Sequence, residues 1–313
     1  MNKVLLIGGA GYIGGYLTDY LLKIGRDVCV YDKLIYERRY LKDVRFVYGD
    51  IRDTDKVIET AKDYDVMVIL AALVGDPVCE INPRLTNEIN TLAVKNICER
   101  YNGHIIFLST CSVYGRKDGI LDEYSATDPL SKYAESKLAA EDYVREKNGT
   151  IFRLGTVYGI GDTHSRIRLD LVVNYLTMKA VYTQKINIYG GEQYRPLICV
   201  KDIAGYIEEA IHNNNNIGTY ILSQENVQMK VLAQRIASMV PFTKVEYTDM
   251  VFQDTRNYQV DNFKARNTFN YKMKHSIDDE VKEMIRIFKE NRIRDVNSSE
   301  YNNGNYIKEN PKL

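Results

Sequence analysis

The sequence predicts an α/β fold in which a doubly wound parallel sheet carries a smaller mixed α/β lobe. In the first half of the chain, short apolar runs alternate with segments whose apolar residues recur at helical spacing. This alternation is the pattern of βαβ units and a parallel sheet. After residue 160 the alternation becomes irregular, which indicates a second lobe of different construction. A chain of 313 residues is long enough to bury a substantial core.

The first half predicts six strands with helices between them. Residues 4–7 form an apolar run, a glycine-rich turn follows, and Ile13, Leu17 and Leu21 then recur on one helical face. Between the fourth and fifth strands, Ile89 and Ile97 mark one face of another helix. The expected strands are residues 4–7, 28–31, 44–48, 66–70, 105–108 and 151–154.

The second half predicts helices near residues 169–176, 201–212, 229–239 and 277–288. We therefore expect a first domain over residues 1–160, to which part of 186–215 returns, and a second lobe over residues 161–290. Residues 291–313 are rich in Asn, Ser, Lys and Glu and contain few apolar side chains. That composition predicts a flexible tail.

The turn after the first strand matches the pattern G-x-G-x-x-G in Gly9-Ala10-Gly11-Tyr12-Ile13-Gly14, with Gly8 immediately before it. Glycines let the chain turn tightly and let a diphosphate approach the backbone N–H groups at the start of the helix. The motif follows a predicted strand, opens an amphipathic helix and precedes an acidic residue at the end of the second strand. This context predicts a Rossmann-type dinucleotide-binding domain rather than a merely structural turn.

Asp32 is that acidic residue. A carboxylate at this position accepts hydrogen bonds from the ribose hydroxyls of an adenosine and repels a 2′-phosphate, so NAD is favoured over NADP. Positive charge nearby, from Lys33 and from Arg38 or Arg39, would soften this preference. Small residues after the fourth strand, Ala71 and Ala72, allow a flat ligand to approach the sheet, although simple packing accounts for them equally well.

The most informative segment is residues 128–138, DPLSKYAESKL. Asp128-Pro129 suits the start of a helix, and the i, i+4 spacing then puts Tyr133 and Lys137 on one face. A tyrosine is a poor base at neutral pH unless its pKa falls by about 3 units, which takes about 4 kcal/mol. A lysine ammonium and an oxidised nicotinamide ring close by supply stabilisation on that scale. The pair is thus a candidate base with the group that tunes it.

Composition excludes several other classes. The chain has 42 basic and 42 acidic residues, so no global field favours nucleic acid or an anionic membrane surface. Its five cysteines are widely spaced, without a Cys-x-x-Cys pair or matching histidines, so we expect neither a disulfide framework nor a metal site. No run approaches the roughly 20 apolar residues of a membrane span. These features predict a cytoplasmic protein.

The motifs together resemble the extended short-chain dehydrogenases/reductases of the NAD-dependent nucleotide-sugar epimerase and dehydratase group. The features in register are the glycine turn, Asp32, Asp50-Ile51, Ala71-Ala72, Asn90, Thr110 with the Val113-Tyr114-Gly115 that follows, and Tyr133 with Lys137, and two further runs match at residues 153–159 and 195–202. The resemblance covers residue 3 to about 288. It implies NAD as cofactor and, as its contacts, Gly8, Gly11, Tyr12, Ile13, Asp32, Lys33, Asp50, Ile51, Leu70, Ala71, Ala72, Asn90, Tyr133 and Lys137.

The resemblance also implies roles at the reacting centre. Thr110 would hydrogen-bond the reacting sugar hydroxyl, Tyr133 would take its proton, and Lys137 would hold the nicotinamide ribose. Arg195 and Arg256 match positions that hold the substrate diphosphate, with a surface or inter-lobe ion pair as the less favoured alternative for each. The implied substrate contacts are Thr110, Cys111, Ser112, Val74, Gly75, Tyr133, Thr156, Asn174, Arg195 and Arg256. Subunit pairing through residues 88–101 and 129–147, and thus a homo-oligomer, is a further implication.

Departures from the family pattern narrow the reaction. Dehydratases of the family carry an Asp-Glu pair after the threonine, and this chain has Cys111 and Ser112 there, which disfavours a 4,6-dehydratase. The remaining readings are a 4-dehydrogenase, a 4-epimerase of the UDP-glucose type and a 4-ketoreductase, with an inactive NAD-binding sensor as an alternative of another class. Residues 168–174, followed by Tyr189-Gly190-Gly191, resemble GDP-heptose 4-dehydrogenases of bacterial capsule biosynthesis. A GDP-manno-heptose 4-dehydrogenase acting on a GDP-linked sugar is therefore the favoured expectation.

Overall fold

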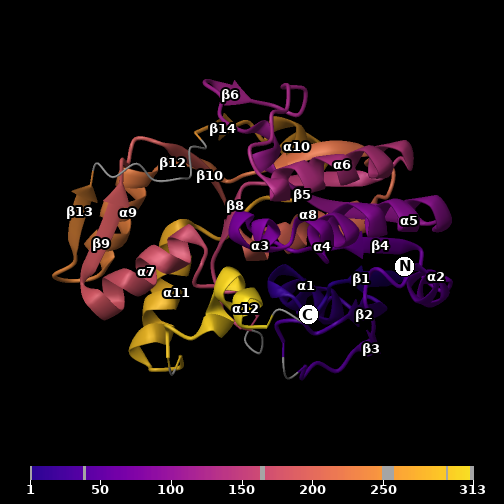
Figure 1. The fold of residues 1–313 in the computed structure, drawn as a ribbon, viewed down its shortest axis with the longest axis horizontal. Coiled ribbons are helices and arrows are strands. Elements are labelled where there is room, and N and C mark those ends of the chain that lie inside the picture. The colour runs from indigo at the N-terminus through magenta and orange to yellow at the C-terminus, as the bar shows by residue number, and fades with distance from the viewer. Residues whose placement is uncertain (1, 38–39, 163–165, 249–256, 294, 311–313) are drawn as a thin grey trace.

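The central element of the computed structural model is a parallel sheet of seven strands (Figure 1). The structure describes residues 2–37, 40–162, 166–248, 257–293 and 295–310. Every neighbouring pair of strands in this sheet runs parallel. In spatial order the strands are β11 (Gly218–Leu222), β7 (Thr150–Leu154), β5 (His104–Thr110), β4 (Val66–Ile69), β1 (Val4–Ile7), β2 (Val28–Asp32) and β3 (Arg45–Tyr48).

Helices cover both faces of this sheet, which explains why its inner strands are apolar without alternation. Leu5 and Ile7 of β1 face a core that they share with α2 (Thr54–Ala61), α5 (Ala93–Arg100) and α6 (Lys132–Glu146). Val4 and Leu6 face the opposite core, built with α1 (Tyr12–Lys23), α8 (Val200–His212) and α10 (Phe263–Thr268). The layers are those of a Rossmann-type domain.

Three short helices lie in the chain between β4 and α5. They are α3 (Asp76–Ile81), α4 (Pro83–Asn87) and the π-helix η1 (Glu88–Leu92), which runs directly into α5. The Asn82 side chain accepts a hydrogen bond from the Leu85 N–H at the start of α4 (3.0 Å). Such a cap fixes where that helix begins.

The second lobe has its own core. One sheet joins β8 (Thr156–Tyr158), β10 (Tyr194–Cys199) and β12 (Glu225–Gln228), and a second pairs β9 (Lys185–Tyr189) with β13 (Lys244–Thr248). Three helices pack with them: α7 (Val172–Thr183), α9 (Met229–Met239) and α11 (Ile277–Lys289). Near the sheet edge, β5 continues into the short helix η2 (Cys111–Tyr114), and β6 (Ile120–Leu121) pairs with β14 (Gln259–Val260).

The chain passes between the domain and the lobe at several places that lie side by side. Only Gly155 separates β7 from β8, β10 runs straight into α8, and two residues separate β11 from β12. The Gly155 N–H donates to the Leu222 carbonyl at 2.9 Å, and the Gln224 N–H donates to the Leu197 carbonyl at 2.7 Å. A Cβ on Gly155 would lie 2.9 Å from the Pro196 carbonyl oxygen, so the crossing is packed tightly.

The expected strands and helices are present, with shifted ends in several cases. The expected domain division differs from the structure. β11 joins the central sheet, and Ala265 and Phe269 of the α10 region pack in its core, so parts of residues 161–290 belong to the first domain. Conversely, β8 lies before residue 160 but pairs with β10 of the lobe. The physical reason is that each element belongs to the sheet or core with which it packs, whatever its position in the sequence.

The C-terminal segment also differs from the expected flexible tail. It forms η3 (Ser299–Tyr301) and α12 (Asn303–Glu309). Tyr306 and Ile307 of α12 are buried, and Ile307 belongs to the core beneath α2, α5 and α6. Two apolar residues one after the other are a weak sequence signal, but here they meet an apolar surface of the first domain. Figure 1 shows α12 between the lobe and the first domain.

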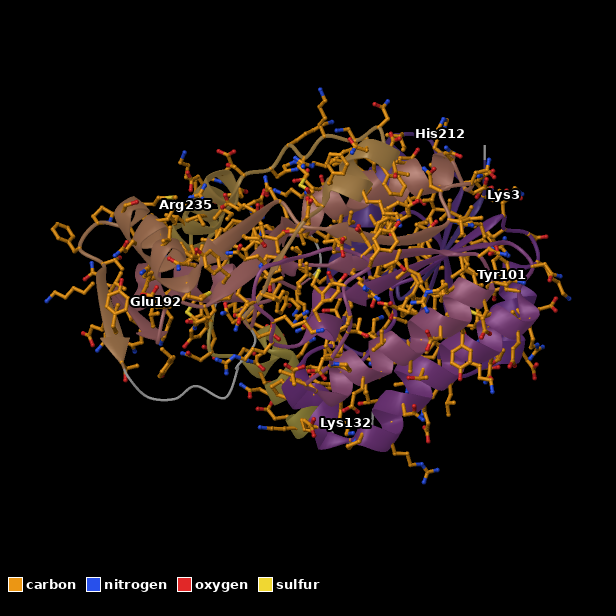
Figure 2. The ribbon with its side chains drawn as sticks, turned by 90° about the horizontal axis from the view of Figure 1, so that it is seen from above. Lys3, Tyr101, Lys132, Glu192, His212 and Arg235 are labelled. Carbon is orange, nitrogen blue, oxygen red and sulfur yellow. The ribbon has the colours of Figure 1, made fainter. Side chains whose placement is uncertain are left out.

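Seen from above, the molecule is elongated, with Glu192 and Arg235 on the lobe and Lys3, Tyr101 and His212 toward the other end (Figure 2). Among the residues that the structure describes, no helix combines the length and apolar character needed to cross a membrane.

Candidate active site

The glycine turn lies between β1 and α1 and is packed against β4. Gly8 has a φ of +86°, and a Cβ on it would lie 2.5 Å from the Ala71 backbone nitrogen. A Cβ on Gly14 would lie 2.6 Å from the Gly8 carbonyl oxygen. Gly11 is the N-cap of α1 and makes no side-chain cap, which leaves the first N–H groups of the helix available. These features fit the diphosphate of a dinucleotide.

Asp32 ends β2 and fixes this turn. Its carboxylate accepts hydrogen bonds from the N–H groups of Ala10 (3.0 Å) and Leu34 (2.7 Å). Burial raises the pKa of Asp32, while these N–H groups oppose that rise. Each carboxylate oxygen has a second lone pair, so Asp32 can also accept hydrogen bonds from ribose hydroxyls.

Lys33 and Asp50, both expected at the cofactor, pair with each other. The Lys33 Nζ lies 3.1 Å from an Asp50 carboxylate oxygen, and Arg52 contacts the same carboxylate through Nη2 at 2.7 Å. Burial raises the pKa of Asp50, but the hydrogen bonds from Arg52 and Lys33 outweigh it and hold the pKa well below its ordinary value. Ile51 is buried in the core. This cluster lies just beyond the ends of β2 and β3.

The loop after β4 is held by Asn90 of η1. The Asn90 side chain accepts from the Leu73 N–H (2.8 Å) and donates to the Leu73 carbonyl (2.9 Å) and the Ser136 hydroxyl (3.0 Å). Leu70 and Ala71 donate their N–H groups to the Ile7 carbonyl. Asn90 is 1% exposed, so it positions the segment that contains Ala72 and Leu73.

Thr110 and Tyr133 meet at the carboxyl end of the sheet. Thr110 is the last residue of β5, and Tyr133 lies in the first turn of α6, whose N-cap Ser131 accepts from the Ala134 N–H. Ser131 also donates to the Asp76 carboxylate at 2.6 Å, which ties the start of α6 to the start of α3. Burial raises the pKa of Tyr133, and a hydrogen bond with Thr110 lowers it by less. The phenol is therefore protonated in this geometry.

Lys137 lies one turn further along α6, as the spacing predicted. Its side chain is 3% exposed, and its Nζ lies 4.0 Å from the centroid of the Phe107 ring. Burial lowers the pKa of Lys137 to about 7, although Glu141 attracts the ammonium. The expectation that Lys137 lowers the tyrosine pKa therefore requires a bound ligand, because burial alone makes both groups resist charging.

A buried ion pair that the sequence did not single out anchors α6. Glu141, one turn beyond Lys137, is paired with Arg153 of β7 through Nε and Nη2, the latter at 2.6 Å. Arg153 also donates to the Tyr114 hydroxyl at 2.9 Å. The sequence feature that could have pointed to Glu141 is its i, i+4 spacing from Lys137, which places both residues on one face of the helix.

The residues after Thr110 are packing groups. Cys111 is fully buried with its thiol 3.4 Å from the Arg153 carbonyl, and burial raises its pKa, so a nucleophilic thiolate is disfavoured. Ser112 donates its N–H to the Thr110 hydroxyl oxygen (3.1 Å). On the facing loop, Gly75 has a φ of +100° and open space around its Cβ position, and Val74 precedes it. Gly75 thus borders a free volume.

The expected substrate contacts in the lobe fall into three groups. The side-chain amide of Asn174 is fully occupied, since it accepts from the Gly159 N–H (3.0 Å) and donates to the carbonyls of Gly159 (3.2 Å) and Arg168 (2.9 Å). Asn174 therefore holds the backbone of residues 159 and 168 in place, where the lobe begins. Arg195 is buried in β10 and donates to the Tyr194 carbonyl, and Thr156 begins β8. Arg256 lies outside the described residues.

Arg168 is a candidate site residue that the sequence analysis did not assign. Its guanidinium lies 6.0 Å from the centroid of the Tyr12 ring, at the first residue of α1, and it is near enough to lower the pKa of Tyr133. The Tyr12 hydroxyl donates to the Gly159 carbonyl at 2.6 Å. The sequence placed Arg168 only within a run similar to one group of enzymes and gave no contact for it.

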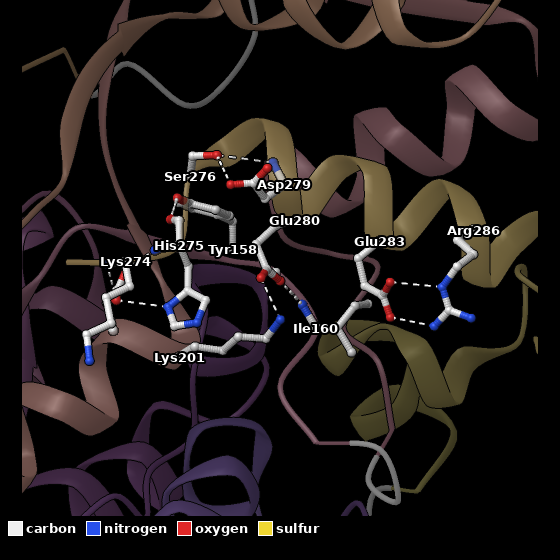
Figure 3. A network of polar contacts seen from close by, with 12 residues as sticks. Tyr158, Ile160, Lys201, Lys274, His275, Ser276, Asp279, Glu280, Glu283 and Arg286 are labelled. Carbon is white, nitrogen blue, oxygen red and sulfur yellow. Dashed lines mark hydrogen bonds and ion pairs between the residues drawn. The ribbon is translucent and has the colours of Figure 1, made fainter.

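A polar network joins α8 to α11 (Figure 3). Glu280 of α11 accepts from Lys201 and from the Ile160 N–H (3.1 Å). Asp202 accepts from the Tyr271 hydroxyl and from the Lys274 and His275 N–H groups. Within the described part of the chain, Cys199, Asp202 and His275 are the three potential metal ligands that lie together. These bonds occupy the Asp202 oxygens, which indicates a structural role.

Known proteins match this chain in sequence and in fold. The model of the NAD dependent epimerase/dehydratase family matches residues 4–222. A Methanocaldococcus jannaschii protein, provisionally named a UDP-glucose 4-epimerase, is 31% identical over 69% of this chain and 76% of its own length. The UDP-glucose 4-epimerase of Lactobacillus helveticus is 26% identical over 89% of this chain and 94% of its own length.

Two solved structures show the same fold. MoeE5 in complex with UDP-glucose and NAD has a TM-score of 0.80 and 23% identity, covering 93% of this chain and 100% of that chain. The Thermotoga maritima UDP-glucose 4-epimerase with UDP-glucose has a TM-score of 0.79 and 21% identity, covering 93% and 100%. NAD, which Asp32 predicted, is the cofactor of the matched family. The glycine turn, the sheet order and the sequence match lead to one conclusion: the chain belongs to the NAD dependent epimerase/dehydratase family.

Proposed function

We propose that this protein uses NAD to oxidise the C4 hydroxyl of a nucleotide-linked sugar, with Tyr133 as the base. The observation that carries the proposal is the meeting of the Thr110 and Tyr133 hydroxyls at the end of β5, with Lys137 one turn along α6. This group lies at the carboxyl ends of the parallel strands, where the glycine turn also ends β1.

Each residue has a defined task in this proposal. Thr110 forms a hydrogen bond with the reacting hydroxyl, as donor or as acceptor, and orients this hydroxyl toward Tyr133. Tyr133 removes the hydroxyl proton, and Lys137 in its charged form stabilises the resulting phenolate. Bound NAD supplies the hydride acceptor. Because burial raises the Tyr133 pKa and lowers that of Lys137, positive charge from the bound ligand has to favour the ionised tyrosine.

The fate of the keto sugar separates two candidate functions. The named relatives favour a UDP-glucose type 4-epimerase, which returns the hydride to the other face of the same carbon. The run of residues 168–174 with Tyr189-Gly190-Gly191 favours a GDP-manno-heptose 4-dehydrogenase of capsule biosynthesis, which releases the keto sugar. In the structure, the Asn174 side chain of that run holds backbone groups, so Asn174 serves the architecture of the lobe and gives the dehydrogenase no added support. We therefore place the epimerase first.

Product analysis distinguishes the two. The purified protein is incubated separately with UDP-glucose and with GDP-manno-heptose, and NMR follows the sugar while absorbance at 340 nm follows reduced cofactor. An epimerase gives the C4 epimer of UDP-glucose with no accumulated reduced cofactor. The dehydrogenase gives a keto sugar from GDP-manno-heptose and one equivalent of reduced cofactor.

The role of Tyr133 has its own test. Tyr133→Phe should abolish turnover and leave NAD affinity nearly unchanged, because only the reacting hydroxyl is removed. Tyr143→Phe, on the same helix α6, is the matched control and should remain active. Turnover by Tyr133→Phe at the wild-type rate would remove the proposed base, and with it the proposed mechanism.

A further inference from the structure

Two arginines lie at the point where the chain enters the lobe, one beside Tyr12 at the start of α1 and the other beside Tyr36. Arg168 is 9% exposed, and its Nε and Nη2 donate to the Asp170 carboxylate at 2.8 and 2.9 Å. Its Nη1 makes no hydrogen bond within the described ranges of the chain. Its guanidinium faces the Tyr12 ring at the first turn of α1. Arg168 thus presents a free donor near the N–H groups that suit a diphosphate.

Arg166 lies beside it and is stacked on a tyrosine. Its guanidinium is 4.1 Å from the centroid of the Tyr36 ring, four residues beyond Asp32. Arg166 donates to the Glu300 carbonyl (2.5 Å) and to the Asn303 side-chain oxygen. The Tyr36 hydroxyl is buried and has no hydrogen-bond partner in the part of the chain that the structure describes. A second unused donor therefore lies in the same region.

The C-terminal segment organises these groups. The backbone N–H of Asn303 donates to Asp170 (3.0 Å), the carboxylate that holds Arg168. The Asn303 side chain accepts from Arg166 and donates to the Val74 carbonyl at 3.4 Å. One residue of α12 thus connects the entrance of the lobe to the loop after β4. Tyr306 adds a ring contact with Tyr36, at 5.3 Å between centroids.

The cluster holds two cations, Arg166 and Arg168, and two anions, Asp170 and Glu37. Burial lowers the pKa of Arg166 to about 10, and repulsion from Arg168 adds to this, although Asp170 and Glu37 attract the guanidinium. Asp170, between the two cations, has a lowered pKa because their attraction outweighs its own burial. Buried charge is costly unless it is compensated, and here the opposite charges compensate one another, while the Nη1 donor of Arg168 stays able to hydrogen-bond an anionic oxygen.

We propose that Arg168 is a further ligand-binding residue, which receives an anionic phosphate oxygen bound in front of the glycine turn, and that Asn303 is its positioning residue. The proposal rests on the proposed function only in taking the cleft to hold NAD and a sugar nucleotide. The phosphate belongs either to the cofactor or to the sugar nucleotide, since both carry a diphosphate. The C-terminal segment then contributes to ligand binding, because its Asn303 positions Arg168.

Calorimetric titration tests the proposal without turnover. The probes are NAD, adenosine, UDP and GDP, and the variants are Arg168→Gln and Asn303→Ala. Arg286→Gln on α11 and Asn305→Ala on α12 are the matched controls, because both side chains are exposed. Arg168→Gln should weaken one diphosphate probe by about tenfold or more, the worth of a charge-assisted hydrogen bond. Asn303→Ala should weaken the same probe, and adenosine affinity should stay unchanged.

The outcomes separate the two sources of phosphate. Weaker NAD binding with unchanged UDP and GDP assigns the contact to the cofactor, and the reverse assigns it to the sugar nucleotide. Unchanged affinity for every diphosphate, or an equal loss for adenosine, overturns the proposal. The thermal midpoint of each variant shows whether a loss merely reports unfolding. A protein that binds NAD through Arg168 but converts no sugar would refute the proposed function and leave this inference standing.

Discussion

Replacing Lys137 with Met should change how the stability of the ligand-free protein depends on pH. The pKa of Lys137 is about 7 in the folded protein against 10.5 for an ordinary lysine, because the side chain is buried. Between these two values the unfolded chain binds more protons than the folded one, so stability rises as the pH rises. Below pH 7 the full cost of the buried ammonium is present.

The size of the effect follows from that window. From pH 7 to pH 9, integration over the two titrations gives about 2 kcal/mol of added stability from Lys137 alone. Urea unfolding of the wild type and of Lys137→Met at both pH values measures this difference. Lys132→Met, exposed at the start of the same helix, is the control and should show no such trend. The quantity compared is the free energy of unfolding of the wild type minus that of Lys137→Met. If this difference stays constant or falls between pH 7 and pH 9, the reasoning is refuted.

Three further changes have defined outcomes. Gly8→Ala should cost about 1–3 kcal/mol and abolish NAD binding, whereas Gly119→Ala, with a similar φ of +85° but open space around it, should leave NAD affinity intact; calorimetry and thermal melting measure both. Arg153→Met should cost about 3–5 kcal/mol in urea unfolding, because it leaves the buried Glu141 carboxylate to the half-exposed Arg145 at 3.3 Å, and a smaller loss would show that Arg145 compensates this carboxylate. Leu92→Glu should shift sedimentation toward the monomer if the protein pairs through residues 88–101, since Leu92 is 41% exposed; an unchanged profile excludes that interface.

The strands of the first domain were predictable because parallel strands buried on both faces read as continuous apolar runs. Val4–Ile7 is fully buried, and so is Val66–Ile69. β11 gave a weaker signal, since Gly218–Leu222 has only three buried residues and follows a run of asparagines. Its place at the end of the sheet depends on pairing with β7, which no local pattern encodes.

The site divides in the same way. Tyr133 and Lys137 are one helical turn apart, and the glycines of the turn lie within residues 8–14, so their spacing in the sequence was enough to predict both groups. Arg168 and Asn303 are brought together by the tertiary fold, and nothing near either residue announces the other. The pKa values could not be predicted from the sequence. The low pKa of Lys137 results from burial against Phe107, which only the packed structure reveals.

The side-by-side crossings near Gly155 have a consequence for biosynthesis. The lobe takes its strands from stretches near residues 156, 194 and 225, and its last core helix ends at Lys289. The first domain is therefore not encoded by one contiguous stretch, and the lobe stays incomplete on the ribosome until Lys289 has emerged. Separate expression of residues 161–290 should yield an aggregating fragment, whereas the intact product can mature as a single cooperative unit.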